Sequence, residues 1–284
     1  ARKGIEKELI KRVNLIIENR NLSIDENNKI VWKNSPIAKI KKGDNYLNPE
    51  FEIITDDALP ETSKNELENF LKVWLSSHIN EVLEDLINLT KKKISNQYLR
   101  ALSFRLFENN GIIKRIEIDQ IIKLISKEER KKLWAMGIKI GRYHVFLPKM
   151  LKPKAVLLRT KLWKLYYDIS KNIYIPKFGL NFFLNENFDS KLLLICGFEK
   201  FQNFFVRVDM LEKLFINIMD KTVNKKFTIS PEMMNLLGCT KENFYKLMEL
   251  MNYKKTKEID TYFFAGDSKK IRKKVYNKKN SESP

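Results

Sequence analysis

The sequence predicts an α+β protein that is mainly α-helical, and three observations lead to this prediction. Apolar residues recur every three or four positions over long stretches, as at Leu67, Leu71 and Leu75, which is the spacing of one helix face. Short runs of β-branched and aromatic residues stand between turn-forming residues near 22–54 and toward the C-terminal end. Apolar residues make up 43% of the chain, enough for a buried core. We expect a small β module, a helical bundle and a winged-helix-like C-terminal domain.

Residues 1–60 are predicted to hold an N-terminal helix and the small β module. Residues 1–20 repeat apolar side chains at helical spacing, which indicates an amphipathic helix. Strands are then expected at 30–32, 37–40 and 51–54. Turns are expected at Asn34-Ser35-Pro36, Gly43-Asp44 and Asn48-Pro49.

Residues 61–168 are predicted to form the helical bundle. A first helix, capped by Thr62-Ser63, is expected to reach about residue 89, with His78 in a structural role near its apolar stripe. Further helices are expected at 95–109, 117–125 and 154–168. Ser126 and Glu129 have the spacing of a capping box that begins another helix, which ends before Gly137.

Residues 169–264 are predicted to form the winged-helix-like domain. A helix at 208–219 and a strand at 227–229 precede a helix that begins at Ser230-Pro231. Gly238 separates that helix from a second one capped by Thr240, and a strand pair follows up to 264. Two short helices joined by a glycine-containing turn match helix-turn-helix spacing. The Lys-rich tail at 265–284 is expected to be disordered.

Several classes of protein are excluded or disfavoured by what the sequence lacks. The two cysteines and two histidines have no zinc-ligand spacing, and no catalytic residue, metal ligand or cofactor site is predicted. No GxxxxGK[ST], GxSxG, HExxH or CxxC motif occurs. No apolar run is long enough to span a membrane and the N-terminus has no signal-peptide core, so we expect no membrane partner and a cytoplasmic location.

The distribution of charge gives the clearest functional indication. The formal net charge is +19, although a lysine-rich codon bias could produce much of that total. From 130 to 167, however, the chain has 11 Lys or Arg residues and no Asp or Glu, where its average composition would give about five acids. Lysine and arginine neutralise phosphates, so this stretch predicts nucleic-acid binding. A basic face packed against an acidic neighbour, with Tyr143 in the core, is the alternative.

The basic stretch also contains two glycines and two rings that suit a nucleic-acid contact. Gly137 is expected to be a helix C′ residue with positive φ, and Gly141 to make room for a nucleic-acid backbone. Tyr143 and His144 could stack on bases. The candidate nucleic-acid-binding residues of this stretch are Lys139, Gly141, Arg142, Tyr143, His144, Lys149, Lys152, Lys154 and Arg159.

Four blocks of the sequence are distinctive when taken together. The longest, at 133–167, reads LWAMGIKIGRYHVFLPKMLKPKAVLLRTKLWKLYY. The other blocks are IVWKNSPIAKIKKGDNYLNPEFEIITDDAL at 30–59, VRVDMLEKL at 206–214 and PEMMNLLGCTKENFYKLMELMNYKK at 231–255. These blocks resemble the C-terminal region of alphaproteobacterial DEAD/DEAH-box helicases, which are relatives of the mitochondrial degradosome RNA helicase.

The resemblance implies that an ATPase core of two RecA-like lobes lies upstream of Ala1. ATP and Mg²⁺ would bind that core in the full-length protein, and this part alone would not hydrolyse ATP. In the family this region is a collar that guides the nucleic-acid strand, and a ribonuclease is a possible partner. Where the family has Arg and Phe, this chain has Lys139 and Ile140, which weakens base stacking there. The matching positions are Gly137, Lys139, Gly141, Tyr143, His144, Pro148, Lys152, Pro153, Arg207 and Asp209.

Arg207 joins the candidate binding residues through this resemblance. The predicted function is that of an accessory region which binds and guides single-stranded nucleic acid, RNA or DNA, within an ATP-dependent RNA helicase. One alternative is a protein-interaction scaffold that docks the helicase core or a ribonuclease. Another is an independent winged-helix DNA-binding module.

Overall fold

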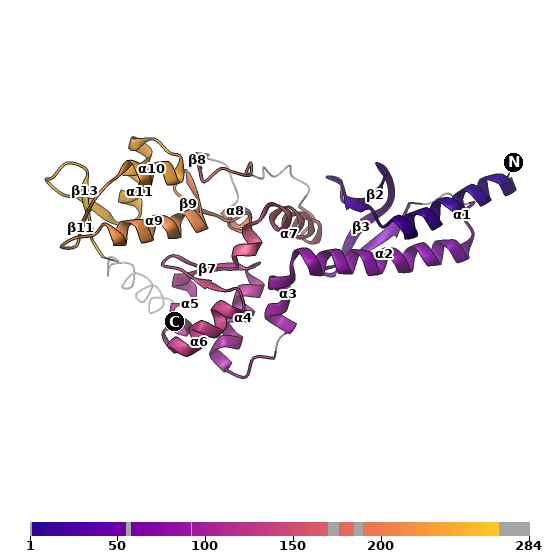
Figure 1. The fold of residues 1–284 in the computed structure, drawn as a ribbon, viewed down its shortest axis with the longest axis horizontal. Helices are drawn as coiled ribbons and strands as arrows, with labels where there is room; N and C mark the ends of the chain where they lie inside the picture. The colour runs from indigo at the N-terminus through magenta and orange to yellow at the C-terminus, as the bar shows by residue number, and fades with distance from the viewer. Residues whose placement is uncertain (1, 55–57, 92, 170–175, 185–189, 267–284) are drawn as a thin grey trace, which may run out of the picture. The chain divides into compact units, whose positions relative to one another are not determined.

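The computed structural model describes residues 2–54, 58–91, 93–169, 176–184 and 190–266 (Figure 1). The predicted α+β class with mainly helical content is confirmed. The chain divides into two compact units. Unit 1 comprises Ala1–Ile113, Ile118–Lys139 and Val145–Tyr174, and unit 2 comprises Lys114–Glu117, Ile140–His144 and Ile175–Pro284.

The N-terminal part of unit 1 combines a helix with a small antiparallel sheet, as expected. Helix α1 (Arg2–Asn19) packs against α2 (Glu61–Val82). The sheet has the order β1-β2-β3-β4, formed by β1 (Leu22–Ile24), β2 (Lys29–Trp32), β3 (Ser35–Asn45) and β4 (Asn48–Ile53).

Two of the turns predicted in this sheet are wrong. Gly43-Asp44 belongs to β3, where the register against β4 shifts between Lys41 and Asn45, so these residues form an irregularity within paired strands. Asn48-Pro49 begins β4. The chain turns between them, where the Asn45 side chain accepts a hydrogen bond from the N–H of Leu47 (3.0 Å).

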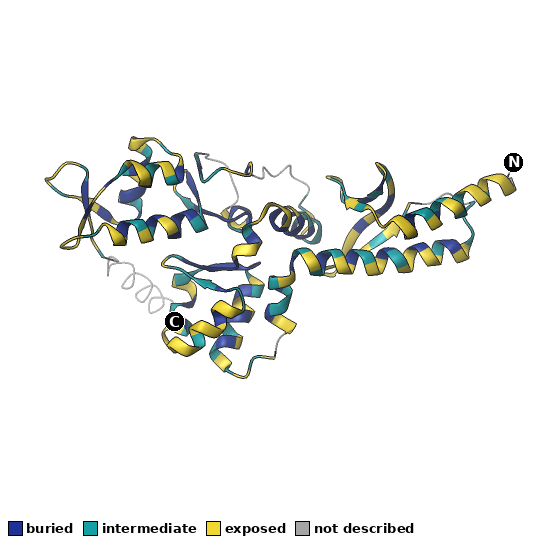
Figure 2. Cartoon of the chain, in the orientation of Figure 1, coloured by how far each residue is buried: buried dark blue, intermediate teal, exposed yellow. Residues whose placement is uncertain are grey.

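The rest of unit 1 is helical. The remaining helices are α3 (Glu84–Lys91), α4 (Gln97–Glu108), α5 (Arg115–Lys123, of which residues 115–117 belong to unit 2), α6 (Lys127–Ala135), η1 (Pro148–Leu151) and α7 (Pro153–Tyr166). In Figure 2 one side of α2 is buried and the other exposed, as the spacing of its leucines predicts. The β module and the bundle lie in one unit, where α7 packs against β3.

Helix ends in unit 1 follow local sequence signals in some places and not in others. The capping box of Ser126 and Glu129 is present at the start of α6. The predicted cap at Thr62-Ser63 is wrong, because α2 begins at Glu61 after Pro60 and Ser63 is buried within the helix. The single long helix expected there breaks at Leu83, where α3 takes over.

Three short strands form a sheet that was not predicted from the sequence. They are β5 (Ile112–Lys114), β6 (Lys139–Ile140) and β7 (His144–Phe146), in the order β5-β7-β6. The unit boundaries fall within these strands. The loop 141–144 lies between β6 and β7.

Unit 2 contains a small aromatic-rich sheet that was not predicted from the sequence. Its strands are β8 (Phe182–Leu184), β9 (Phe198–Phe201) and β10 (Phe204–Arg207), in the order β8-β10-β9, with α8 (Ser190–Ile195) before β9. The antiparallel pairs place Phe183 opposite Phe205, and their rings stack 4.9 Å apart.

The C-terminal part of unit 2 has the expected winged-helix order. It consists of α9 (Val208–Asp220), β11 (Lys226–Thr228), α10 (Pro231–Leu237), α11 (Lys241–Leu250), β12 (Tyr253–Lys255) and β13 (Thr261–Phe264). The sheet order β11-β13-β12 closes the wing against α9 to α11. The core contains Leu211, Leu214, Phe244, Leu247, Met248 and Tyr262.

The turn between α10 and α11 is built as its residues predict. Gly238 has φ of 69° at the end of α10, and the Thr240 side chain caps α11 by accepting from the N–H of Asn243. Ser230 occupies the N-cap position of α10 but makes no capping hydrogen bond, and its Oγ accepts from Lys221 Nζ (2.9 Å). Most of the tail predicted at 265–284 lies outside the described residues.

Candidate nucleic-acid interface

The loop 141–144 is held by one buried carboxylate. Three consecutive backbone N–H groups, those of Arg142, Tyr143 and His144, donate to the carboxylate oxygens of Glu212 at 2.6, 2.8 and 2.9 Å. Glu212 lies on α9, and only 2% of the residue is exposed. Successive N–H groups that converge on one anion form a concave anion site, and here the anion is part of the protein.

His144 is a buried residue that joins two carboxylates. Its Nε2 lies 2.9 Å from Glu199 and its Nδ1 3.7 Å from Glu212, and Glu199 also contacts the Lys114 ammonium (2.5 Å). Burial lowers the pKa of His144, but the hydrogen bonds and charges of the two carboxylates outweigh it and raise this pKa above the ordinary value. The ring is 1% exposed, so the prediction that it stacks on a base is wrong.

The carboxylates of this cluster are held ionised. Burial raises the pKa of Glu212, but His144 and the three loop N–H groups lower it below the ordinary range. For Glu199, burial likewise raises the pKa, and hydrogen bonds from His144 and Lys114 lower it overall. The cluster is therefore a buried set of ion pairs that fixes the loop to α9 and to β9.

Gly141 allows another group to approach its backbone closely, as predicted, but that group is not a nucleic acid. It is absent from the residues with positive φ, so backbone conformation does not require a glycine there. A Cβ built on Gly141 would overlap the carboxyl group of Glu212. The glycine therefore makes room for an internal carboxylate. Arg115 adds to this packing by donating to the Gly141 carbonyl (2.8 Å).

Tyr143 packs against the core of unit 2. Its ring meets Phe215 edge-on at 5.8 Å, and its hydroxyl lies 3.4 Å from that of Tyr253. Burial is the main reason that its pKa is raised. The ring is thereby engaged within the protein, so the expected base stacking at Tyr143 has no support in this arrangement.

Three predicted cationic contacts are engaged within the protein. Arg159 is completely buried and donates to the backbone carbonyls of Asn110 and Met150, so its assignment as a phosphate contact is wrong. Arg207 forms a two-pronged pair with Asp209, with distances of 2.6 and 2.8 Å. Lys149 remains exposed but pairs with Asp85 at 2.9 Å.

The remaining predicted cations reach the surface. Lys152 and Lys154 of unit 1 are exposed and form no ion pair with the described residues, and the same holds for Lys131 and Lys132 on α6. Lys139 is half-buried, with its ammonium 5.9 Å from the centre of the Phe146 ring. These lysines of the acid-free stretch remain available to an external anion.

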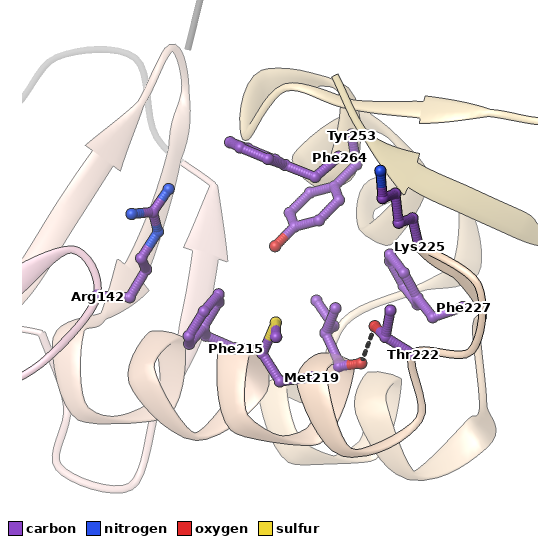
Figure 3. Close-up of a pocket in the computed structure, with 9 residues that line it drawn as sticks. Arg142, Phe215, Met219, Thr222, Lys225, Phe227, Tyr253 and Phe264 are labelled. Carbon is purple, nitrogen blue, oxygen red and sulfur yellow. Dashed lines mark hydrogen bonds between the residues drawn. The ribbon is translucent and has the colours of Figure 1, made fainter. Parts of the chain in front are cut away.

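Arg142 is the one side chain of the 141–144 loop that is exposed, and it stands beside a pocket in unit 2. Its guanidinium lies 5.9 Å from the Phe215 ring and 5.6 Å from the Phe264 ring. The pocket has a volume of about 400 Å³ (Figure 3). Its lining residues are Arg142, Phe215, Ile218, Met219, Thr222, Lys225, Phe227, Tyr253 and Phe264.

The sequence reading missed the acids that hold the loop and the aromatic residues of the pocket. One signal could have found Glu212: it lies on the buried side of α9, four residues after Val208 and three before Phe215. A single acid within a buried helix face needs a partner. No comparable signal joins Phe215 to Phe264, because their contact with Arg142 depends on the tertiary fold.

Comparison with protein-family models, with curated proteins and with solved structures found no match for this chain. Within the described part of the chain, no helix is both long and apolar enough to cross a membrane.

Proposed function

We propose that this chain binds single-stranded nucleic acid and serves as the accessory C-terminal region of an ATP-dependent RNA helicase. The observation that carries the binding proposal is the exposed, unpaired state of Lys131, Lys132, Lys152 and Lys154, within a stretch that has no acid in the sequence. Ammonium groups without acidic partners are free to neutralise phosphates.

The composition of α11 favours binding of single-stranded nucleic acid over binding in the groove of a duplex. This helix stands where a winged helix would read a major groove. Lys241 is paired with Asp260 (2.7 Å), and the exposed positions that follow include Glu242, Lys246 and Glu249. Such a mixed surface gives little attraction for the closely spaced phosphates of a duplex.

The helicase part of the proposal rests on the resemblance of the 133–167 block. In that arrangement the ATPase core, with its ATP and Mg²⁺, would be supplied by sequence upstream of Ala1. This chain would contribute strand contacts, and a ribonuclease would be a further partner of the whole protein. A cytoplasmic location is part of the same proposal.

Binding of a labelled oligouridine, measured by fluorescence anisotropy at several salt concentrations, tests the proposal. The affinity should fall steeply between about 50 and 200 mM salt, with a slope near −0.7 for each phosphate contact. A duplex DNA of equal length should bind less tightly. Absence of binding at the lowest salt would contradict the proposal and favour a protein-interaction scaffold. Tighter duplex binding would favour an independent winged-helix DNA-binding module.

A further inference from the structure

The pocket of unit 2 combines an aromatic wall with two cations. Phe215 and Met219 come from α9, and Tyr253 and Phe264 come from the two strands of the wing. Figure 3 shows Arg142 and Lys225 on opposite sides of the cavity, with the Tyr253 hydroxyl directed into it. A volume of about 400 Å³ lies within the range of small-ligand sites.

The charges around the pocket favour an anionic occupant. The described residues that line it include no acid, whereas Arg142 and Lys225 are both among them. Glu212 of the loop cluster does not line the pocket, and its carboxylate already accepts from three N–H groups and lies 3.7 Å from His144 Nδ1. In a ligand that carries a phosphate beside an apolar ring, the phosphate would pair with the cations and the ring would pack against the aromatic residues.

The aromatic residues of the pocket are placed for stacking. Phe264 is 40% exposed, although it is a phenylalanine, and Met219 on the opposite wall is 53% exposed. The Phe264 ring lies between Arg142 (5.6 Å) and the Tyr253 ring (5.4 Å). Exposed aromatic rings with arginine beside them are the platforms on which single-stranded nucleic acids stack their bases.

We infer that this pocket binds one base of a single-stranded nucleic acid, with the neighbouring phosphates on Arg142 and Lys225. The inference rests on the proposed strand binding and assigns to it a base-binding subsite in unit 2. The base would stack against Phe264. Thr222 also lines the cavity, and its hydroxyl donates to the Ile218 carbonyl (2.6 Å, dashed in Figure 3).

The matched substitutions Phe264→Ala and Phe263→Ala test the subsite. The two residues are adjacent on β13 and similarly exposed, Phe264 at 40% and Phe263 at 36%. Successive residues of a strand face opposite sides of the sheet, and Phe263 does not line the pocket. Oligouridine affinity should fall about five- to hundredfold for Phe264→Ala, because one stacked base is lost. It should stay within about twofold of the unsubstituted chain for Phe263→Ala, which loses no stacked base.

An abasic oligomer with the same number of phosphates separates base recognition from phosphate attraction. The unsubstituted chain should prefer oligouridine to this probe, and Phe264→Ala should abolish the preference. Arg142→Gln provides a second variant that leaves the backbone N–H to Glu212 in place. It should weaken binding of both oligomers and reduce the salt slope by about 0.7. Thermal melting of each variant shows whether it folds.

The possible outcomes separate this inference from the proposed function. If the unsubstituted chain binds neither oligomer, the proposed function and the subsite both fail. If it binds both equally well, or if Phe264→Ala binds as Phe263→Ala does, the subsite fails and strand binding stands. If uridine monophosphate occupies the pocket without competing with oligouridine, the pocket is a free-nucleotide site and the assignment to a strand is wrong.

Discussion

The 141–144 loop and the 152–154 segment are near neighbours in the sequence of one acid-free stretch, yet their polar groups have different partners. In the loop, three backbone N–H groups and the His144 ring meet the carboxylates of Glu212 and Glu199. In the segment, Lys152 and Lys154 extend into solvent without a partner among the described residues. The first arrangement stabilises unit 2, and the second leaves charge available for binding.

This difference shows why the charge of a sequence segment does not fix its role. The stretch contains no acid, but the fold supplies one from 68 residues farther along the chain, since the His144 N–H bonds Glu212. Each group that is paired in this way is removed from the candidate binding surface. The comparison therefore predicts stability effects for the loop and binding effects for the segment.

Glu212→Ala should have the largest effect on stability. It leaves three loop N–H groups without an acceptor and removes one of the two carboxylates beside the His144 ring. Removing one member of a buried ionic cluster costs about 3–5 kcal/mol. The free energy of unfolding in urea should be measured for Glu212→Ala and for a control, Glu258→Ala, which removes one partner of an exposed ion pair with Lys226. A loss below about 1 kcal/mol, the level of an exposed pair, would contradict the role of Glu212.

Gly141→Ala should be the next most destabilising change. The new Cβ would displace the Glu212 carboxylate and weaken its hydrogen bonds, at a cost of about 1–3 kcal/mol. The sequence alone favoured the opposite result, normal stability with weakened nucleic-acid binding. Thermal melting decides between the two. An unchanged melting temperature would mean that Glu212 can move away from Gly141 without cost.

Gly137→Ala should cost about 1–2 kcal/mol for a different reason. Gly137 has φ of 82° after α6, a conformation that a Cβ disfavours. Its Cβ would also lie 3.0 Å from Asp85 Oδ2. Gly137→Asn should be less harmful, because asparagine tolerates positive φ. Equal losses for the two variants would indicate that contact with Asp85 matters more than backbone conformation.

The buried cluster should make unit 2 most stable between mildly acidic and neutral pH. The folded-state pKa of His144 is raised. Its contribution to the free energy of unfolding is therefore fully present below about pH 6.5 and is lost as the pH rises through the raised pKa. The folded-state pKa values of Glu199 and Glu212 are lowered. Their contributions to the free energy of unfolding are therefore present above about pH 4.5 and are lost as the pH falls through the lowered pKa values. Urea midpoints across pH measure both losses. In His144→Gln the loss on the alkaline side should disappear.

Some sequence signals that act within a few residues predicted the structure correctly, although the turns at Gly43-Asp44 and Asn48-Pro49 and the cap at Thr62-Ser63 were wrong. The capping box of Ser126 and Glu129, the positive φ of Gly137 and the cap at Thr240 each depend on neighbours along the chain. The winged-helix order followed from the same kind of signal. The break at Leu83 and the sheet formed by β8, β9 and β10 were missed, because tertiary packing decides them.

The candidate site was predicted less completely than the fold. The exposed state of Lys152 and Lys154 agrees with the expectation from charge, whereas the burial of Arg159 depends on the carbonyls of Asn110 and Met150. Nothing in the run of lysines and arginines distinguishes a buried cation from an exposed one. The aromatic pocket is likewise a product of the fold, since Arg142 and Phe264 are far apart in sequence.

The most direct test of the central claim compares two double charge reversals. Lys152→Glu with Lys154→Glu changes exposed cations of the acid-free stretch, and Lys7→Glu with Lys11→Glu changes two exposed cations on α1 by the same net charge. The first pair should leave melting nearly unchanged, weaken oligouridine binding and reduce the salt slope by about 1.4, two contacts at about 0.7 each. The second pair should change binding far less. Equal binding losses in the two variants would contradict the account, because the attraction would then come from the overall charge of the chain.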